Sequence, residues 1–355
     1  MKKILLLLFQ FPILIFCQHP TTDKNWNATP IFDEEFVGIR SWDNNRKDNT
    51  GTWYAYWTEC GVIHLPEFQV YQRENALFNT PTSGYLTLRA EYRPNTDTST
   101  IWYPFWTTLP KAKWDYFSGA IESVRKFKYG YFEIRCALPP ANKGNFPAFW
   151  LWEYINRYSE IDIFEHTIHG KVSDERCFTG GYYTSNGIGE NRVNYDIPLN
   201  EPGLTNFHTY AVEWSPKSII WYFDNKQVGS ARNEPEITDE SMAIKVNYAL
   251  DDYVKGANNS LFPLNMVIDY VKVYQLKCDK LTIVNEISNF STFNYAVKKS
   301  ISLSGATTIP ANSNISLRAT DFIELTNGFE VPLGVELYLD ITPCDNTTRT
   351  KKQDY

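Results

Sequence analysis

Three carboxylates stand close together in the run Glu160-Ile161-Asp162-Ile163-Phe164-Glu165, interleaved with large apolar side chains. This alternation predicts a β-strand with one face in a core. Because side chains alternate between the two faces of a strand, Glu160 and Asp162 project together. Glu165 follows Glu160 by an odd number of residues and would point the other way in a regular strand. Bringing all three acids to one face therefore requires a β-bulge near Ile163 and Phe164.

Such a group of acids suits glycoside hydrolysis. One carboxylic acid protonates the leaving oxygen, and a second carboxyl group attacks the sugar or activates a water. A retaining enzyme needs these two carboxyls about 5–5.5 Å apart. Glu160 and Glu165 would reach this distance by leaning together on a bent strand, whereas Asp162 is too short. Asp162 is expected to hydrogen-bond Glu160 and to help one carboxyl keep its proton. The alternative interpretation is a strand whose acidic face is simply solvated.

Sequence blocks on both sides of the acids favour the enzymatic interpretation. They are residues 128–135 (KYGYFEIR), 146–152 (FPAFWLW), 207–214 (FHTYAVEW) and 266–274 (MVIDYVKVY). In this order and spacing the chain resembles glycoside hydrolase family 16 from about Phe32 to Tyr274. The resemblance implies an all-β fold, a concanavalin-like β-jelly-roll sandwich with a substrate cleft on its concave face. It also implies a glycosidase that hydrolyses O-glycosyl bonds with retention.

The same resemblance implies roles for individual residues. Glu160 corresponds to the nucleophile, Asp162 to its helper and Glu165 to the general acid/base. The spacing E-x-D-x-x-E resembles the laminarinase branch and the marine-galactanase branch (agarases and porphyranases), whereas lichenases mostly have E-x-D-x-E. No cofactor is expected to be required for catalysis. Candidate substrate-binding residues are aromatic or polar side chains in these blocks, beside the acids, or in a strand near the end of the domain: Trp150, Trp152, Tyr158, His166, Trp214 and Asn247.

Resemblance to the family also suggests a structural calcium ion on the convex face. The matching carboxylates are Glu35, near the first strand, and Asp269, in the last strand of the domain. Hard oxygen ligands suit calcium. Two carboxylates far apart in sequence are nevertheless more often surface charges, so a stabilising ion is the most that we expect here.

Length and composition indicate more than one domain. The 355 residues, 43% hydrophobic and 16% aromatic, suffice for one large all-β domain and a smaller one. Residues 1–18 resemble a secretion signal. We expect the catalytic jelly roll over 19–277, a small β-repeat module over 278–344 and a disordered tail over 345–355. Cys278 and Cys344 flank the module and are candidates for a disulfide.

Charge and hydropathy limit the partners. The formal net charge of −7 at pH 7 gives no electrostatic reason to bind nucleic acid. No apolar stretch is long enough to predict a membrane-spanning helix. We expect a secreted, extracellular monomer whose partner is a polysaccharide. The alternative is a protein anchored at the cell surface by a lipid on Cys17, because residues 14–17 (LIFC) loosely resemble a lipobox.

The sequence thus predicts a secreted, endo-acting, retaining β-glycoside hydrolase. Laminarin-type β-1,3-glucan comes first among substrates because the acidic net charge disfavours heavily sulfated chains. A marine galactan hydrolase of the agarase or porphyranase type is the alternative. A transglycosylase would use the same acids, with an acceptor sugar in place of water. A non-catalytic jelly-roll lectin is expected to lack one of the acids, and here none is missing.

Overall fold

The computed structural model describes residues 19–20, 26–57, 62–64, 66–79, 84–101, 111–154, 158–170, 177–184, 190–196, 204–215, 218–232, 237–238, 240–278, 282–285, 297–309, 311 and 314–342. The predicted signal, residues 1–18, and the predicted tail, residues 345–355, lie outside this description. So do Cys17 and Cys344.

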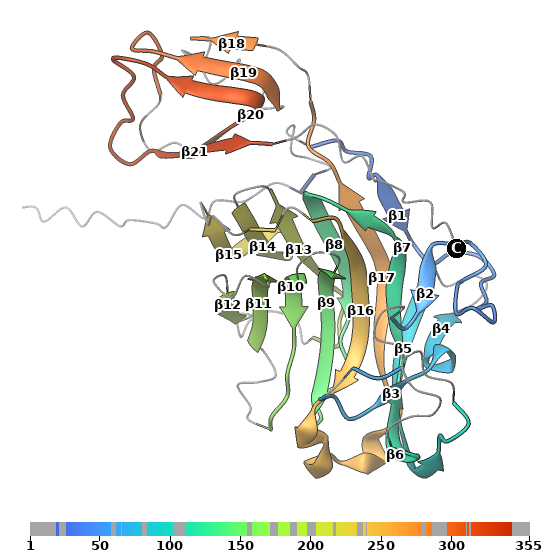
Figure 1. The fold of residues 1–355 in the computed structure, drawn as a ribbon. Coiled ribbons are helices and arrows are strands. Elements are labelled where there is room, and N and C mark those ends of the chain that lie inside the picture. The colour runs from blue at the N-terminus through green and yellow to red at the C-terminus, as the bar shows by residue number, and fades with distance from the viewer. Residues whose placement is uncertain are drawn as a thin grey trace, which may run out of the picture.

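Two β-sheets packed face to face form the main body (Figure 1), which confirms the predicted all-β sandwich. The first sheet has ten strands in the order β15-β14-β13-β8-β17-β5-β6-β3, with β1 paired to β17 and β4 to β5. Its strands are β1 (Phe32–Glu34), β3 (Val70–Tyr71), β4 (Ala76–Asn79), β5 (Tyr85–Asp97), β6 (Lys113–Ser118), β8 (Gly130–Ala137), β13 (His208–Trp214), β14 (Ser218–Phe223), β15 (Lys226–Arg232) and β17 (Leu264–Tyr274).

The second sheet carries the acids. It has seven antiparallel strands in the order β12-β11-β10-β9-β16-β7-β2. Its strands are β2 (Trp53–Ala55), β7 (Ala120–Phe127), β9 (Asn145–Tyr154), β10 (Tyr158–Glu165), β11 (Cys177–Thr184), β12 (Glu190–Asp196) and β16 (Met242–Leu250).

The core lies between the two sheets and follows the period-two alternation of the strands. On β9, for example, Phe149 and Leu151 are fully buried in this core. Their neighbours Trp150 and Trp152 belong to or pack against a separate cluster on the opposite face of the sheet. Burial of apolar surface from both sheets at about 25 cal/mol per Å² is the main stabilising contribution. The outer face of the seven-stranded sheet is left to carry functional side chains.

The described residues hold only short 3-10 helices: η1 (Arg73–Asn75), η3 (Asp252–Gly256) and η4 (Asn259–Leu261). The side chain of Asp251 caps η3 by accepting a hydrogen bond of 2.9 Å from the backbone N–H of Tyr253. None of the helices in the described ranges is long and apolar enough to cross a membrane.

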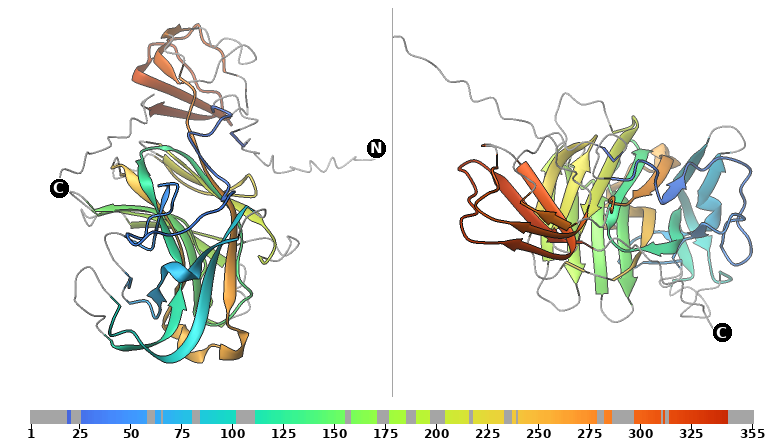
Figure 2. Two further views of the ribbon diagram at one scale, coloured as in Figure 1. Left: turned by 90° about the vertical axis from the view of Figure 1, so that its right-hand side faces the viewer. Right: turned by 90° about the horizontal axis from the view of Figure 1, so that it is seen from above.

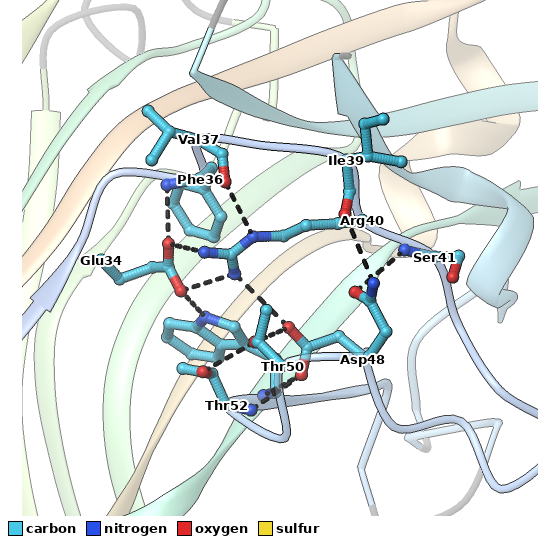
Figure 3. A network of polar contacts seen from close by, with 11 residues as sticks. Glu34, Phe36, Val37, Ile39, Arg40, Ser41, Asp48, Thr50 and Thr52 are labelled. Atoms are coloured by element: carbon cyan, nitrogen blue, oxygen red, sulfur yellow. Dashed lines mark hydrogen bonds and ion pairs between the residues drawn. The ribbon is translucent and has the colours of Figure 1, made fainter. Parts of the chain in front are cut away.

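A buried polar network joins the start of the first sheet to the edge of the second (Figure 3). The guanidinium of Arg40 donates two hydrogen bonds of 2.7 Å to the carboxylate of Glu34 and lies 3.4 Å from Oδ2 of Asp48. The indole N–H of Trp53, on β2, donates to Glu34 at 3.0 Å. Both carboxylates are almost fully buried, so the arginine supplies the charge that makes their burial tolerable.

A third sheet lies beyond the sandwich, above β13 to β15 in Figure 1 and clear of the sandwich in the left view of Figure 2. Its four strands are parallel in the order β18-β19-β20-β21: β18 (Thr282–Val284), β19 (Lys298–Leu303), β20 (Asn314–Leu325) and β21 (Glu336–Ile341). A buried ion pair of Arg318, on β20, with Glu213, on β13, joins it to the sandwich. The domain boundaries drawn from the sequence stay predictions. Cys278 is disulfide-bonded, and its predicted partner, Cys344, is outside the described residues.

Candidate active site

Strand β10 contains the predicted bulge. On the side of β9, Asp162 pairs with Trp150 and Phe164 pairs with Phe149, so Ile163 is the extra residue in the ladder. The register of β10 against β11 shifts in the same interval, between Asp162 and Glu165. The bulge near Ile163 and Phe164 is therefore confirmed.

The bulge decides which way Glu165 points. Ile163 and Phe164 are consecutive, yet both are fully buried in the core between the sheets. Glu165 consequently returns to the outer face that Glu160 and Asp162 already occupy, and all three acids line one pocket. Glu160 and Glu165 are half-buried, whereas Asp162 is only 3% exposed.

A tryptophan from the opposite sheet holds the strand where it bulges. The indole N–H of Trp221, on β14, donates across the core to the backbone oxygen of Asp162 at 2.8 Å. Gly180 lies opposite on β11, and a Cβ there would come within 2.5 Å of the indole nitrogen. A glycine is thus needed for the indole to approach the strand, because both groups are enclosed in a close-packed core.

The acids line a pocket of about 590 Å³. Its walls come from β9, β10 and β16, from the loop before β3, and from the start of η3. The lining residues are His64, Pro66, Glu67, Phe68, Phe146, Ala148, Trp150, Glu160, Asp162, Glu165, Asn247, Asp251 and Asp252.

A chain of hydrogen bonds ties these walls together. The indole N–H of Trp150 donates to Oδ1 of Asn247 at 2.8 Å, and Nδ2 of Asn247 donates to the hydroxyl oxygen of Tyr71 at 3.1 Å. The hydroxyl of Tyr71 donates to Oε2 of Glu67 at 2.7 Å, and Oε1 of Glu67 lies 3.1 Å from Nδ1 of His64. Strands β9, β16 and β3 and the preceding loop are thus held in one fixed arrangement around the acids.

The charge of the pocket is strongly one-sided. Six of its lining residues are acids: Glu67, Glu160, Asp162, Glu165, Asp251 and Asp252. Burial raises the pKa of Asp251, although the backbone N–H of Tyr253 and the nearby His169 act to lower it. Burial alone would lower the pKa of His64. The hydrogen bond to Glu67 and the charges of Glu67 and Glu160 outweigh this effect and raise that pKa.

Three of the predicted binding residues lie beside the acids. Trp150 and Asn247 line the pocket, and both ends of the Asn247 amide are engaged within the protein. Trp152 stands directly opposite Glu160 in the ladder, is half-buried, and has the ammonium of Lys245 at 4.6 Å from its ring centroid. Tyr158 begins β10, but its side chain lies outside the described residues.

Two predicted binding residues belong to the interior instead. Trp214 is 1% exposed, faces the core between the sheets and donates its indole N–H to the backbone oxygen of Thr238 at 3.2 Å. His166 is 3% exposed and stacks on Phe178, a core residue, at a centroid distance of 4.7 Å. Neither side chain is among those that line the pocket of the acids, and the burial of both argues against a contact with substrate.

The carboxylates proposed for calcium are each paired with a basic side chain. Glu35 accepts a hydrogen bond of 2.7 Å from Lys272, which also lies 3.1 Å from Asp33. Asp269 forms an ion pair with Arg135. Among the described residues there is no group of three or more acidic, histidine or cysteine side chains that could hold a metal ion. A cation at Glu35 and Asp269 would compete with these ion pairs, so the arrangement does not fit calcium well and its binding stays a prediction.

Sequence reasoning missed one wall of the pocket. His64, Glu67 and Phe68 come from the loop before β3, about 100 residues ahead of the acids, and Asp251 and Asp252 from the segment after β16. No motif marks these residues. The one available signal was the run from His64 to Tyr71, which places a histidine, an acid, an amide and a phenol within eight residues.

Comparison with known sequences supports the family resemblance that the sequence blocks suggested. The sequence model described as glycosyl hydrolases family 16 matches residues 67–271, more than half of the chain and inclusive of all three acids. The chain belongs to this family. Membership agrees with the two-sheet sandwich and with the family resemblance of the sequence blocks.

Individual relatives of this family 16 chain differ in their named substrates. The chain is 32% identical over 170 residues to the endo-1,3-1,4-beta-glycanase ExsH of Rhizobium meliloti (strain 1021), covering 47% of this chain and 35% of that protein. It is 27% identical over 187 residues to the kappa-carrageenase of Pseudoalteromonas carrageenovora, covering 45% and 47%. The chain therefore spans less than half of the length of these relatives.

A solved structure shows the same fold. It is the catalytic domain of an endo-1,3-beta-glucanase (laminarinase) from Thermotoga petrophila RKU-1, with a TM-score of 0.55 and 25% identity, covering 71% of this chain and 98% of that domain.

Proposed function

We propose that the protein is an endo-acting, retaining β-glycoside hydrolase of a neutral β-glucan, with β-1,3-glucan as the first candidate. The observation that carries the proposal is the bulge in β10, which turns three carboxylates onto one face at a pocket. Membership in family 16 supports the reaction class. The glycanase and laminarinase similarities support an endo-acting enzyme on glucans.

In this proposal Glu160 and Glu165 carry the two chemical steps. Glu165, protonated, gives its proton to the glycosidic oxygen while the Glu160 carboxylate attacks the anomeric carbon. The carbon–oxygen bond to the leaving sugar breaks and a glycosyl ester with Glu160 forms. Glu165, now ionised, accepts a proton from water, whose oxygen displaces Glu160 and restores both acids.

Asp162 acts on the other two acids rather than on the sugar. It lies between Glu160 and Glu165 in the strand, on the same face, and is almost fully buried. A buried negative charge makes it costly for all three carboxyls to ionise together, which favours one carboxyl of the cluster keeping its proton. That proton is the one that Glu165 transfers to the leaving group.

Pocket charge guides the choice of substrate. Six acids line the pocket, and sulfate or uronate groups would be repelled by them. Neutral sugars suit it, since their hydroxyl groups donate to carboxylates. A galactan hydrolase is the second candidate, supported by the similarity to the kappa-carrageenase, and the pocket favours neutral agarose over a sulfated galactan. A transglycosylase would use the same three acids.

The proposal is tested by incubating wild type, Glu160→Gln, Glu165→Gln and Asp162→Asn with laminarin, lichenan, agarose, porphyran and κ-carrageenan. Wild type is expected to release oligosaccharides from one neutral glycan. Either glutamine variant should lose at least about 1,000-fold in kcat with an unchanged circular dichroism spectrum. Asp162→Asn should lose less and shift the acid limb of the pH profile. Products should keep the β-configuration when first released, as observed by NMR.

Opposite results would reject specific parts of the proposal. Full activity of Glu160→Gln or Glu165→Gln would remove the assigned roles. Initial release of α-anomers would exclude retention. Binding of a glycan without cleavage would instead identify a lectin, and product chains longer than the substrate would identify a transglycosylase.

Secretion also belongs to the proposal, supported by the signal-like residues 1–18. N-terminal sequencing of protein from the culture medium should begin near His19. Mass spectrometry that found a lipid on Cys17 would establish the anchored alternative. Gel filtration of the same sample is expected to show a monomer.

A further inference from the structure

The side chain of His64 lines the pocket and is held in place by a hydrogen bond and two aromatic contacts. Its Nδ1 lies 3.1 Å from Oε1 of Glu67. Its ring meets Trp57 edge-on at a centroid distance of 4.8 Å and lies tilted by 30° to Trp150 at 6.1 Å. The side chain is still 41% exposed. The imidazole is therefore fixed in orientation on one side and open to the pocket on the other.

Glu67, in turn, is held by two further donors. Its Oε2 accepts hydrogen bonds from Nε2 of Gln69 at 2.5 Å and from the hydroxyl of Tyr71 at 2.7 Å. An ionised carboxylate can only accept, so the nitrogen of His64 that faces Glu67 carries a proton. Among the described residues no other group is hydrogen-bonded to His64, so Nε2 is available to a ligand in the pocket that His64 lines.

The pocket is short of cationic donors. Its ionisable lining residues are six acids and His64, and the amide of Asn247 is engaged with Trp150 and Tyr71. Sugar hydroxyl groups donate to carboxylates, but their oxygens also accept hydrogen bonds. When protonated, His64 is the cationic donor that the described lining residues offer to such an oxygen.

We propose that His64 is a further substrate-binding residue, which is anchored by Glu67 at Nδ1 and donates from Nε2 to a hydroxyl oxygen of the sugar that Glu160 attacks. This inference rests on the proposed function and deepens it. The charge of Glu160 acts on the imidazole, in keeping with both residues lining the same pocket.

The charged groups around His64 set the pH range in which it donates. They are Glu67 in its own loop, Glu160 on β10 and Lys245 on β16. Burial and Lys245 favour the neutral ring, but the two glutamates outweigh them, so the pKa of His64 is raised above its ordinary value of 6.5. Nε2 therefore remains a donor through pH 6.5. It loses its proton only as the pH rises through the raised pKa, because Nδ1 keeps the proton shared with Glu67.

Two variants of His64 distinguish a contact with the sugar from a purely structural role, because each keeps one of the two hydrogen bonds of the imidazole and removes the other. In asparagine the amide nitrogen is two bonds from Cβ, as Nδ1 is in histidine. In glutamine it is three bonds from Cβ, as Nε2 is. His64→Asn can keep the contact with Glu67 but loses the donor to the sugar. His64→Gln can keep that donor but loses the contact.

The test compares kcat and KM of wild type, His64→Asn and His64→Gln on the glycan cleaved in the panel. We expect His64→Asn to lower kcat/KM by about 10- to 100-fold, mainly through KM, and His64→Gln to stay within about fivefold of wild type. The advantage of wild type over His64→Asn should shrink as the pH rises above the raised pKa. His169→Gln is the matched control, since His169 is also bonded to a pocket acid, Asp251, at 3.1 Å, and it should match wild type.

Each other result would overturn the inference. Equal activity of His64→Asn and wild type would show that no sugar contact exists. A loss in His64→Gln greater than in His64→Asn would show that the histidine only anchors the loop. If wild type cleaves no glycan, the proposed function fails separately, and calorimetric titration of the same panel decides on His64. Binding that is weakened by His64→Asn but not by His64→Gln would support the contact, whereas equal binding, or none, would reject it.

Discussion

The hydrogen bond from Trp221 to β10 makes a prediction that separates stability from catalysis. Trp221→Phe removes the N–H that lies 2.8 Å from the backbone oxygen of Asp162 and leaves that oxygen buried beside a smaller ring. An unsatisfied buried acceptor costs about 1–3 kcal/mol and the lost ring volume adds about 1 kcal/mol, so the free energy of unfolding should fall by roughly 2–4 kcal/mol.

The catalytic effect follows from the position of that bond. Asp162 immediately precedes the bulge that turns Glu165 outward, so a relaxed bulge would displace Glu165 relative to Glu160. A displacement near 1 Å can cost about 100-fold in rate, and we expect kcat of Trp221→Phe to fall by about 10- to 100-fold.

Trp214→Phe is the matched control. Trp214 is equally buried and also donates to a backbone oxygen, that of Thr238 at 3.2 Å. Thr238 bonds β10 at Ser159, three residues before Asp162, and not at the bulge. Urea unfolding should show a similar loss of stability in both variants, whereas kcat on the cleaved glycan should fall in Trp221→Phe alone. An unchanged kcat in Trp221→Phe, or an equal fall in Trp214→Phe, would refute the reasoning.

Three further perturbations test other parts of the fold. Arg40→Met leaves Glu34 and Asp48 buried without their cation and should lower the free energy of unfolding in urea by about 3 kcal/mol; a change below about 0.5 kcal/mol would contradict the role of the network. For Asp224, burial alone would raise the pKa, but the hydrogen bonds from His208 and the backbone of Thr209 lower it below the ordinary value of 3.8. Its contribution to stability is therefore present above that value and lost as the pH falls through the folded-state pKa, so the stability difference between wild type and Asp224→Asn should narrow with acidification below pH 4. Finally, Glu35 and Asp269 are paired with Lys272 and Arg135, so treatment with EGTA should change the melting temperature by less than about 1 °C. A large drop in the melting temperature would establish a bound calcium ion.

The orientation of the three acids on β10 was predictable because the spacing of the acids determines which face of the strand each side chain occupies. Alternation with period two places Glu160 and Asp162 on one face, and the position of Glu165 then requires one extra residue. The structure provides it at Ile163. The fold class was equally accessible, since the sequence blocks around the acids match a family with a sandwich fold.

The binding residues were less predictable because burial on both faces of a strand hides its orientation. In β13, Trp214 faces the core between the sheets, while Ala211 on the other face is covered by a second cluster that includes Trp26 and Tyr131. Alternation is lost from the sequence when both faces are apolar. His166 directly follows the outward-facing Glu165, and its side chain is buried against the core residue Phe178.

His64 illustrates a different limit. Its partners are Glu67, three residues along the chain, and Trp57 and Trp150 from two different strands or loops. A histidine in a loop has no periodicity to show which way it points, and its neighbours are fixed only when the chain folds. The pocket wall opposite the acids is therefore a property of tertiary structure.

The bulge also determines how a one-residue deletion in β10 would affect the three acids. In a regular strand, loss of one residue sends every later side chain to the opposite face. Here the extra residue, Ile163, lies between Asp162 and Glu165, and its removal would leave three acids at alternate positions of an unbulged strand, all still facing the pocket. A single-codon deletion at this point would thus keep the orientation of the acids and shorten the span between the outer two. We therefore expect a β10 strand shortened by this residue to keep its three acids at the pocket, and libraries that vary this length can test whether the pattern of cleavage changes.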